Sequence, residues 1–327
     1  MLDCRPLVLF ACAITLAVSE QASAQAQTSG LDLSLLHKMQ ARAIGPAVVG
    51  GRIGAVAGVP GDPTVIWAGA SAGGVWRSTD GGVTFDAVFD DQDVASIGAI
   101  AVHPTANDIV WVGSGEGNPR NSASVGRGMY RTTDGGRTWT KLGLERTERI
   151  HRIVLHPSDA DTAWVSAFGT SWGENEQRGV FKTTDGGQTW RKVLYVDERT
   201  GCSDLILDPR NPDKLFASMW QHRRWPWAFK SGGPGSGLYR SLDGGESWQR
   251  LDHDDGLPKG ELGRIGLALA PSDPDVVYAL TEAKKSVLLR SDDGGFQFRV
   301  VNRSDDIAPR PSRPASRSCG HRRSRRR

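Results

Sequence analysis

The chain has 327 residues, of which 38% are hydrophobic and 24% charged, and these ordinary globular proportions exclude disorder throughout. Its 40 glycines and 11 tryptophans indicate many tight turns and aromatic anchors, so they favour an all-β fold over long helices. The net charge of +3 depends on residues 307–327, which hold eight arginines and no acid; subtracting these eight charges from +3 leaves −5 for the rest.

The first 24 residues are typical of a secretory signal peptide. Arg5 lies near the start, an apolar run extends from Leu7 to Val18, and Ala22–Ala24 provides a small-residue cleavage site. The apolar run is too short to span a bilayer, and no other stretch approaches the roughly 20 apolar residues that spanning needs. We therefore expect export to the periplasm or the extracellular medium, no transmembrane segment, and an N-terminal linker over residues 25–44.

One short motif then occurs five times. Each copy has an aspartate followed by two glycines, with Ser or Thr two residues before the aspartate and Trp or Phe five residues after it. The aspartates are 54, 51, 58 and 50 residues apart, a period that suits one four-stranded blade of a β-propeller. The copies are Ser78–Phe85, Thr132–Trp139, Thr183–Trp190, Ser241–Trp248 and the degenerate Ser291–Phe298, with aspartates Asp80, Asp134, Asp185, Asp243 and Asp293.

A hairpin turn explains every part of this motif. The carboxylate accepts backbone N–H groups within the turn, the glycines supply positive φ, and the closing aromatic ring packs between sheets. Because all five aspartates occupy the same turn position, we interpret them as structural residues and not as paired catalytic carboxylates.

A second pattern precedes each motif: an apolar strand, a proline turn and another apolar strand, as in Ile100–Pro104 followed by Asp108–Val112. With a Gly-aromatic-Arg strand such as Gly128–Arg131 and a strand after the motif, each unit contains four strands. The sequence thus predicts five blades over residues 45–302. Their approximate bounds are 45–92, 93–145, 146–198, 199–258 and 259–302.

Two histidines and the C-terminus invite functional interpretations that we do not favour. His103 and His156 occupy the turn position that Asp208 fills elsewhere, so they are turn residues rather than metal ligands. Residues 303–327 are expected to form a basic disordered tail, which a shifted reading frame or truncated gene explains better than function does. An exported protein rarely meets nucleic acid, so no nucleic-acid partner is expected.

The five motifs resemble the BNR, or Asp-box, repeats of β-propellers that include sialidases, xyloglucanases, photosystem assembly factors and sortilin-type receptors. The resemblance covers residues 45–302 and is closest to bacterial exported sortilin-like proteins, often labelled glycosyl hydrolases. It implies a β-propeller with five blades present, fewer than such propellers usually close with. We expect an incomplete propeller whose unpaired edges invite association; a closed five-bladed ring is the alternative.

The residues that the enzyme families need do not carry over. Xyloglucanases place a catalytic Asp in Thr-Asp-x-Gly-Gly-x-Tyr, whereas the similar stretch here, Ala70–Trp76, has Ser71 at that position. Sialidases have an early Arg-Ile-Pro, whereas this chain has Arg52–Gly54. No metal-ligand cluster, phosphate-binding loop or nucleophile elbow occurs either, so we assign no catalytic residue, metal or cofactor.

Three insertions predict a ligand-binding face. They join the second and third strands of blades two, three and four, on the face opposite the Asp motifs, as loops 115–122, 170–178 and 220–236. Their exposed Trp rings would offer flat apolar surfaces on which a sugar or a peptide could pack. Their polar groups would form directional hydrogen bonds with the same ligand. The candidate ligand-binding residues are Glu116, Asn118, Arg120, Trp172, Glu174, Trp220, His222, Arg224, Trp225 and Trp227.

Three functions stay open at this point. The leading hypothesis is a non-catalytic exported propeller that binds a peptide or glycan on this face. The first alternative is a glycoside hydrolase, with Glu116 and Glu174 as an acid and base pair or with catalytic residues partly in missing blades. The second alternative is an assembly factor with protein partners.

Overall fold

The computed structural model describes residues 51–304. The predicted signal peptide (1–24), the linker (25–44) and the predicted tail from residue 305 onward lie outside the described residues. The described part is all-β, with one short 3-10 turn, η2 (Glu145–Thr147). The predicted fold class is confirmed at this level.

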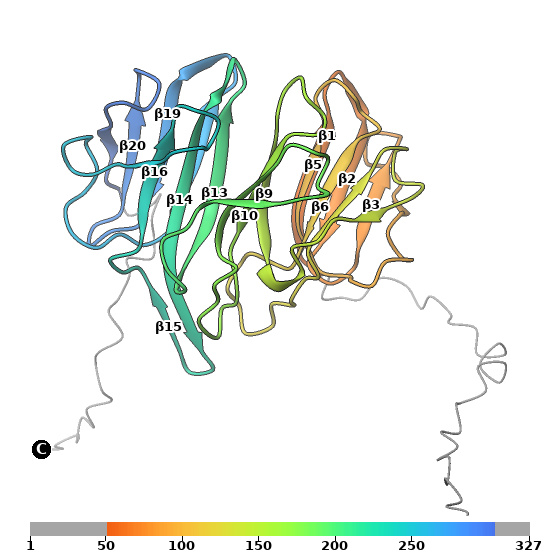
Figure 1. Ribbon diagram of the computed structural model, residues 1–327, viewed down its shortest axis with the longest axis horizontal. Coiled ribbons are helices and arrows are strands. Elements are labelled where there is room, and N and C mark those ends of the chain that lie inside the picture. The colour runs from red at the N-terminus through yellow and green to blue at the C-terminus, as the bar shows by residue number, and fades with distance from the viewer. Residues whose placement is uncertain (1–50, 305–327) are drawn as a thin grey trace, which may run out of the picture. The chain divides into compact units, whose positions relative to one another are not determined.

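The strands form five antiparallel sheets, which we call blades one to five. Sequential strands are neighbours in every sheet, and they lie across Figure 1 in chain order from blade one (orange) to blade five (blue). The strands are β1 (Ile53–Val59), β2 (Asp62–Ala70), β3 (Val75–Ser78) and β4 (Asp86–Ala87) in blade one; β5 (Ile97–Val102), β6 (Val110–Ser114), β7 (Met129–Thr132) and β8 (Thr140–Lys141) in blade two; β9 (Ile150–Leu155), β10 (Ala163–Ala167), β11 (Gly179–Thr183) and β12 (Arg191–Leu194) in blade three; β13 (Thr200–Asp208), β14 (Asn211–Trp225), β15 (Ala228–Ser231), β16 (Gly237–Ser241) and β17 (Gln249–Arg250) in blade four; and β18 (Ile265–Ala270), β19 (Asp273–Thr281), β20 (Val287–Ser291) and β21 (Arg299–Asn302) in blade five.

The hydrophobic core lies between the blades. All five residues of β6 and of β10 are buried, because blades two and three each have a neighbour on both faces. In β20 of blade five, buried residues alternate with half-buried ones, since only one face of that blade is covered. Four core clusters join successive blades, and none in the part of the chain that the structure describes joins blade five to blade one.

The Asp-Gly-Gly turns join the third and fourth strand of each blade. In blade two, Asp134 accepts the backbone N–H groups of Arg137 and Thr138, both at 2.9 Å, and the Thr138 hydroxyl at 2.6 Å. Gly135 and Gly136 have φ of 71° and 89°, which favours glycine. These bonds hold the carboxylate charged: the pKa values of Asp185 and Asp243 in the equivalent turns are lowered to about 2, chiefly by the hydroxyls of Thr189 and Ser247.

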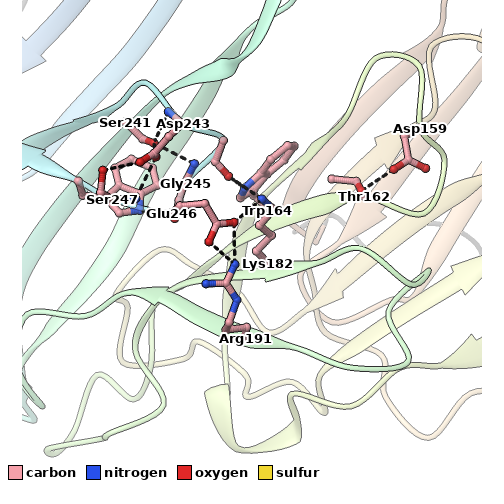
Figure 2. Close-up of polar contacts among 12 residues, drawn as sticks. Asp159, Thr162, Trp164, Lys182, Arg191, Ser241, Asp243, Gly245, Glu246 and Ser247 are labelled. Carbon is pink, nitrogen blue, oxygen red and sulfur yellow. Dashed lines mark hydrogen bonds and ion pairs between the residues drawn. The ribbon is translucent and has the colours of Figure 1, made fainter.

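The turns of blades two to five also pack on the blade before them, as Figure 2 shows for blades three and four. The indole N–H of Trp164 donates to the carbonyl of Gly244 at 3.0 Å, and Lys182 donates to the same carbonyl at 2.9 Å. Glu246, next to the glycines, accepts from Lys182 at 2.8 Å and from Arg191 at 2.6 Å. A turn formed by local bonds is therefore also a contact between sheets.

The strand order gives each blade two different ends. The Asp-Gly-Gly turns lie at one end, and the loops between second and third strands lie at the other, as expected for antiparallel neighbours. Strand β14 continues beyond its sheet and pairs with β15, so blade four carries an extra hairpin that projects at the loop end (Figure 1). This hairpin positions the candidate site.

Candidate functional site

The β14–β15 hairpin draws the three predicted loops together. The Arg224 backbone N–H donates to the Ser171 carbonyl at 2.8 Å, and the Arg224 guanidinium donates to the Pro119 carbonyl at 2.8 Å. Arg224 also bonds the side-chain oxygen of Asn121, whose amide nitrogen donates to the Pro226 carbonyl at 3.3 Å. Loops from blades two, three and four thus form one surface, with Arg224 as the residue that connects them.

A pocket of about 200 Å³ opens between the hairpin and the loop of blade three. Trp225 forms an apolar wall, and the Arg223 guanidinium lies 5.5 Å from the centre of its ring. Glu174 is the one acidic lining residue, and it already accepts from Arg199 at 3.1 Å. The side chains that line the pocket are Glu174, Arg199, Gln221, His222, Arg223, Trp225 and Lys230. Three lining cations face one carboxylate, so the pocket has a net positive charge.

Two predicted contact residues are buried at the base of this site: Trp220, which does not line the pocket, and His222, which does. Trp220 is only 3% exposed, and its indole N–H donates to the Ser231 hydroxyl at 3.0 Å. The His222 ring lies 4.8 Å from the Trp220 ring and 4.2 Å from that of Phe168. The expectation of three exposed tryptophans is therefore wrong for Trp220, because β14 directs its ring into an aromatic cluster.

His222 is a buried, neutral member of this cluster. Burial, and secondarily the charge of Arg178, lower its pKa well below the ordinary value. Its Nε2 atom has no hydrogen-bond partner among the described residues. A buried polar atom at the edge of a pocket is a point at which a ligand can donate or accept a hydrogen bond.

The loop of blade three is held by Arg178, a residue that the sequence analysis did not select. This buried guanidinium donates to four carbonyls, those of Phe168, Thr170, Gly173 and Arg199, at 3.2, 2.5, 2.8 and 3.2 Å. Burial lowers its pKa to about 10. The one available signal was its place directly before the β11 strand, at the end of an insertion. The pocket cations Arg199, Arg223 and Lys230 were missed as well.

The remaining predicted residues surround the pocket in different ways. Glu116 is buried and accepts from Arg52 at 2.9 and 2.6 Å, and Asn118 accepts from Arg264 at 3.3 Å. Glu116 and Glu174 are thus each paired with an arginine, Arg52 and Arg199 respectively. Trp227, at the tip of the hairpin, is 83% exposed. Arg120 and Trp172 complete the set, on loops 115–122 and 170–178, and Trp172 is also exposed.

The described residues contain one group of side chains that could hold a metal ion. That group is Asp252, His253 and Asp254, all exposed, far in sequence from the pocket lining. His156 serves its turn, since its Nδ1 accepts the Asp159 backbone N–H at 3.0 Å. The equivalent His103 accepts the Thr105 backbone N–H at 3.4 Å. Both histidines therefore have turn contacts.

Comparison with known proteins agrees with the repeat pattern. Residues 73–223 match the model of the Sortilin-Vps10 family, described as sortilin, neurotensin receptor 3. These comparisons support the predicted resemblance to the BNR, sortilin-like propeller family. A xyloglucanase from Paenibacillus sp is 28% identical over 221 residues, which cover 61% of this chain and 20% of that enzyme. Xyloglucanase Xgh74A from Acetivibrio thermocellus is 27% identical over 218 residues, or 59% of this chain and 24% of the enzyme.

The fold has a solved counterpart. The crystal structure of an ancestral GH74 enzyme superposes with a TM-score of 0.56 at 19% identity, covering 77% of this chain and 31% of that one. At this identity the likeness concerns the fold alone. The sortilin-like chain spans about a fifth to a quarter of the length of the curated relatives given above. Within residues 51–304, no helix has the length and apolarity needed to cross a membrane.

Proposed function

We propose that this chain is an exported, non-catalytic binding protein, and that its ligand is a peptide or glycan that carries an anionic group. The observation that carries the proposal is the pocket beside Trp225, whose lining includes Arg199, Arg223 and Lys230 but only one carboxylate. A flat indole beside arginine and lysine donors suits a sugar ring or peptide segment with a carboxylate or similar group. Export rests on the signal-like residues 1–24.

The non-catalytic part of the proposal is supported by the residues at the candidate catalytic positions. Ser71 stands where the resembling xyloglucanase motif has its Asp, and Ser71 is buried. The carboxylates of Glu116 and Glu174 each accept a hydrogen bond from an arginine side chain. We further propose that the five blades are part of an incomplete propeller, since the core clusters formed by residues 51–304 link successive blades only.

A calorimetric titration of the full chain with paired probes tests this function. The probes are a galacturonate oligosaccharide, a neutral xyloglucan oligosaccharide of equal length, and one peptide with a free or an amidated C-terminus. We expect an acidic probe to bind more tightly than its neutral partner. Arg223→Ala should weaken binding by about tenfold or more, since one charge-assisted hydrogen bond is worth about 1.5–3 kcal/mol.

Arg137→Ala is the matched control, because Arg137 is an exposed arginine on the opposite, Asp-Gly-Gly end of blade two. It should leave binding unchanged. If every probe fails to bind, or if Arg223→Ala and Arg137→Ala have equal effects, the pocket is not the binding site.

A second candidate function is hydrolysis of xyloglucan, which the xyloglucanase relatives favour. Incubation of the full chain with xyloglucan, followed by a reducing-sugar assay, separates the two candidates. Release of sugar that Glu174→Gln abolishes would replace the binding proposal with a catalytic one. No release, together with binding of a probe, would leave the non-catalytic proposal standing.

A further inference from the structure

The first four blades contact the next blade through one recurring pair of side chains. An aromatic residue on the second strand lies directly opposite a cation on the third strand. The pairs are Trp67 with Arg77, Trp111 with Arg131, Trp164 with Lys182, and Phe216 with Arg240. In the first three pairs the cation lies over the ring, 5.4, 5.0 and 5.4 Å from its centre.

The Asp-Gly-Gly turn of the next blade fits against this pair. A Cβ on the second glycine would lie 2.8, 3.1, 3.0 or 2.3 Å from the facing aromatic ring, so only glycine fits there without displacement; these glycines are Gly136, Gly187, Gly245 and Gly295. In three of the four contacts the cation donates to a carbonyl of the two glycines: Arg131 to Gly186 at 3.4 Å, Lys182 to Gly244 at 2.9 Å and Arg240 to Gly295 at 2.9 Å. We call this contact between successive blades a joint. The preceding blade contributes its aromatic-cation half, and the following blade contributes its turn half.

Blade five presents an aromatic-cation half with no turn upon it. Tyr278 and Arg290 are opposite each other in the same register, and the Arg290 guanidinium lies 5.5 Å from the tyrosine ring. Among residues 51–304, the hydrogen bonds and ion pair of Arg290 join it to Tyr278 and Asp292 of its own blade and to no residue of another blade. Leu280, two residues from Tyr278 and on the same face of β19, is 39% exposed.

Blade one presents the complementary half, a turn that no other blade covers among residues 51–304. A Cβ on Gly81 would meet no atom within 4 Å, and one on Gly82 would meet only Ile66 and Phe85 of its own blade, at 3.5 and 3.9 Å. Phe85, the closing aromatic residue of this turn, is 39% exposed, whereas the equivalent Phe298 of blade five is buried. The aromatic ring that the joint between blades four and five covers is thus open to solvent in blade one.

We propose that blade five of one molecule receives the Asp80 turn of a second copy, so that chains associate head to tail. Tyr278 and Arg290 would take the roles that Phe216 and Arg240 have in the joint between blades four and five. Figure 1 shows blade one and blade five at opposite ends of the row, so the two halves of one molecule do not meet each other. Such a contact uses two different surfaces and builds rings or open chains, not an isologous dimer.

Two single substitutions in the full chain test the contact. Arg290→Glu removes the cation half and Phe85→Glu damages the turn half, and both side chains lie at the ends of the row of blades. Arg137→Glu is the control, with the same charge change on an exposed arginine of an internal blade. Sedimentation velocity from submicromolar to high micromolar concentration should show association of the unmodified chain and of the control. Each test variant should associate at least about tenfold more weakly.

Mixing the two variants gives the decisive result. Arg290→Glu retains an intact turn and Phe85→Glu retains an intact aromatic-cation pair, so an equimolar mixture should form a 1:1 dimer that grows no further. An isologous contact would not be restored in this way. The proposal is overturned if the unmodified chain is monomeric throughout, if neither substitution weakens association, or if the mixture stays monomeric. Unchanged circular dichroism of both variants shows that loss of association is not loss of fold.

Discussion

The second glycine of each Asp-Gly-Gly turn provides a stability test that separates backbone strain from packing between blades. Gly295 and Gly82 occupy the same position in the motif, with φ of 85° and 92°. A Cβ on Gly295 would lie 2.3 Å from the ring of Phe216 in blade four, whereas one on Gly82 would meet nothing closer than 3.5 Å. Substitution of each by alanine therefore introduces the same backbone strain, but only one of them introduces a clash.

The expected costs follow from these two terms. Alanine with positive φ costs about 1–2 kcal/mol, which applies to both variants. Overpacking of a well-packed core adds about 1–3 kcal/mol, and this applies to Gly295→Ala alone because the buried Phe216 ring has to move. We therefore expect Gly82→Ala to destabilise the chain by about 1–2 kcal/mol and Gly295→Ala by about 2–5 kcal/mol.

Urea denaturation of the full chain, followed by tryptophan fluorescence, measures the difference. The protein is kept at submicromolar concentration so that head-to-tail contacts do not contribute to the stability of the Gly82 turn. The midpoint of Gly295→Ala should fall clearly below that of Gly82→Ala. Equal midpoints would mean that the turns are not packed against the preceding blade, and the description of the joints would be refuted.

Three further predictions concern the same joints and core. Because the folded pKa of Asp185 and Asp243 is lowered to about 2 from 3.8, their turns contribute stability above pH 3.8 that is lost as the pH falls toward 2; melting temperatures across this range should drop, and less steeply in Asp185→Asn. Trp164→Phe keeps a ring but removes the N–H bond to the Gly244 carbonyl (Figure 2), and should lower the free energy of unfolding by about 1 kcal/mol or more. Cys202 is buried with its pKa raised to about 12, so a thiol reagent should modify it only after unfolding; modification in the native chain, located by mass spectrometry, would contradict its burial.

The fold was predictable because its signals are local. The Asp134 carboxylate accepts hydrogen bonds from residues three and four positions further along the chain, so the motif itself determines the geometry of its turn. Five such turns at a blade-sized period are enough to indicate five four-stranded sheets. The strand order then places the insertions at the opposite end, which is why loops 115–122, 170–178 and 220–236 could be grouped before the structure was known.

The pocket was not predictable in the same way, because side-chain direction decides it. Trp220 and Trp225 lie on the same long strand, yet the first enters an aromatic cluster and the second lines the pocket. Arg178 acts through four carbonyls that are 5 to 21 residues away along the chain, and no residue pattern announces this. The Trp, Arg and Glu residues of the three loops thus indicated a binding surface. The sequence could not show which of these side chains are buried beneath the pocket and which line it.

The two ends of each blade are under different physical constraints. At the turn end, Gly245 has a φ of 86° and a Cβ there would lie only 3.0 Å from Trp164, so glycine is favoured, and Lys182 donates to the Gly244 carbonyl. One change at such a joint affects two blades, so sequence variation there is costly. At the loop end, the β14–β15 hairpin contributes Trp225 and Arg223 without entering any of the four core clusters. Substitutions in that hairpin can therefore change what the chain binds while the stack of blades stays intact, and this separation makes the Arg223→Ala titration a test of binding and not of stability.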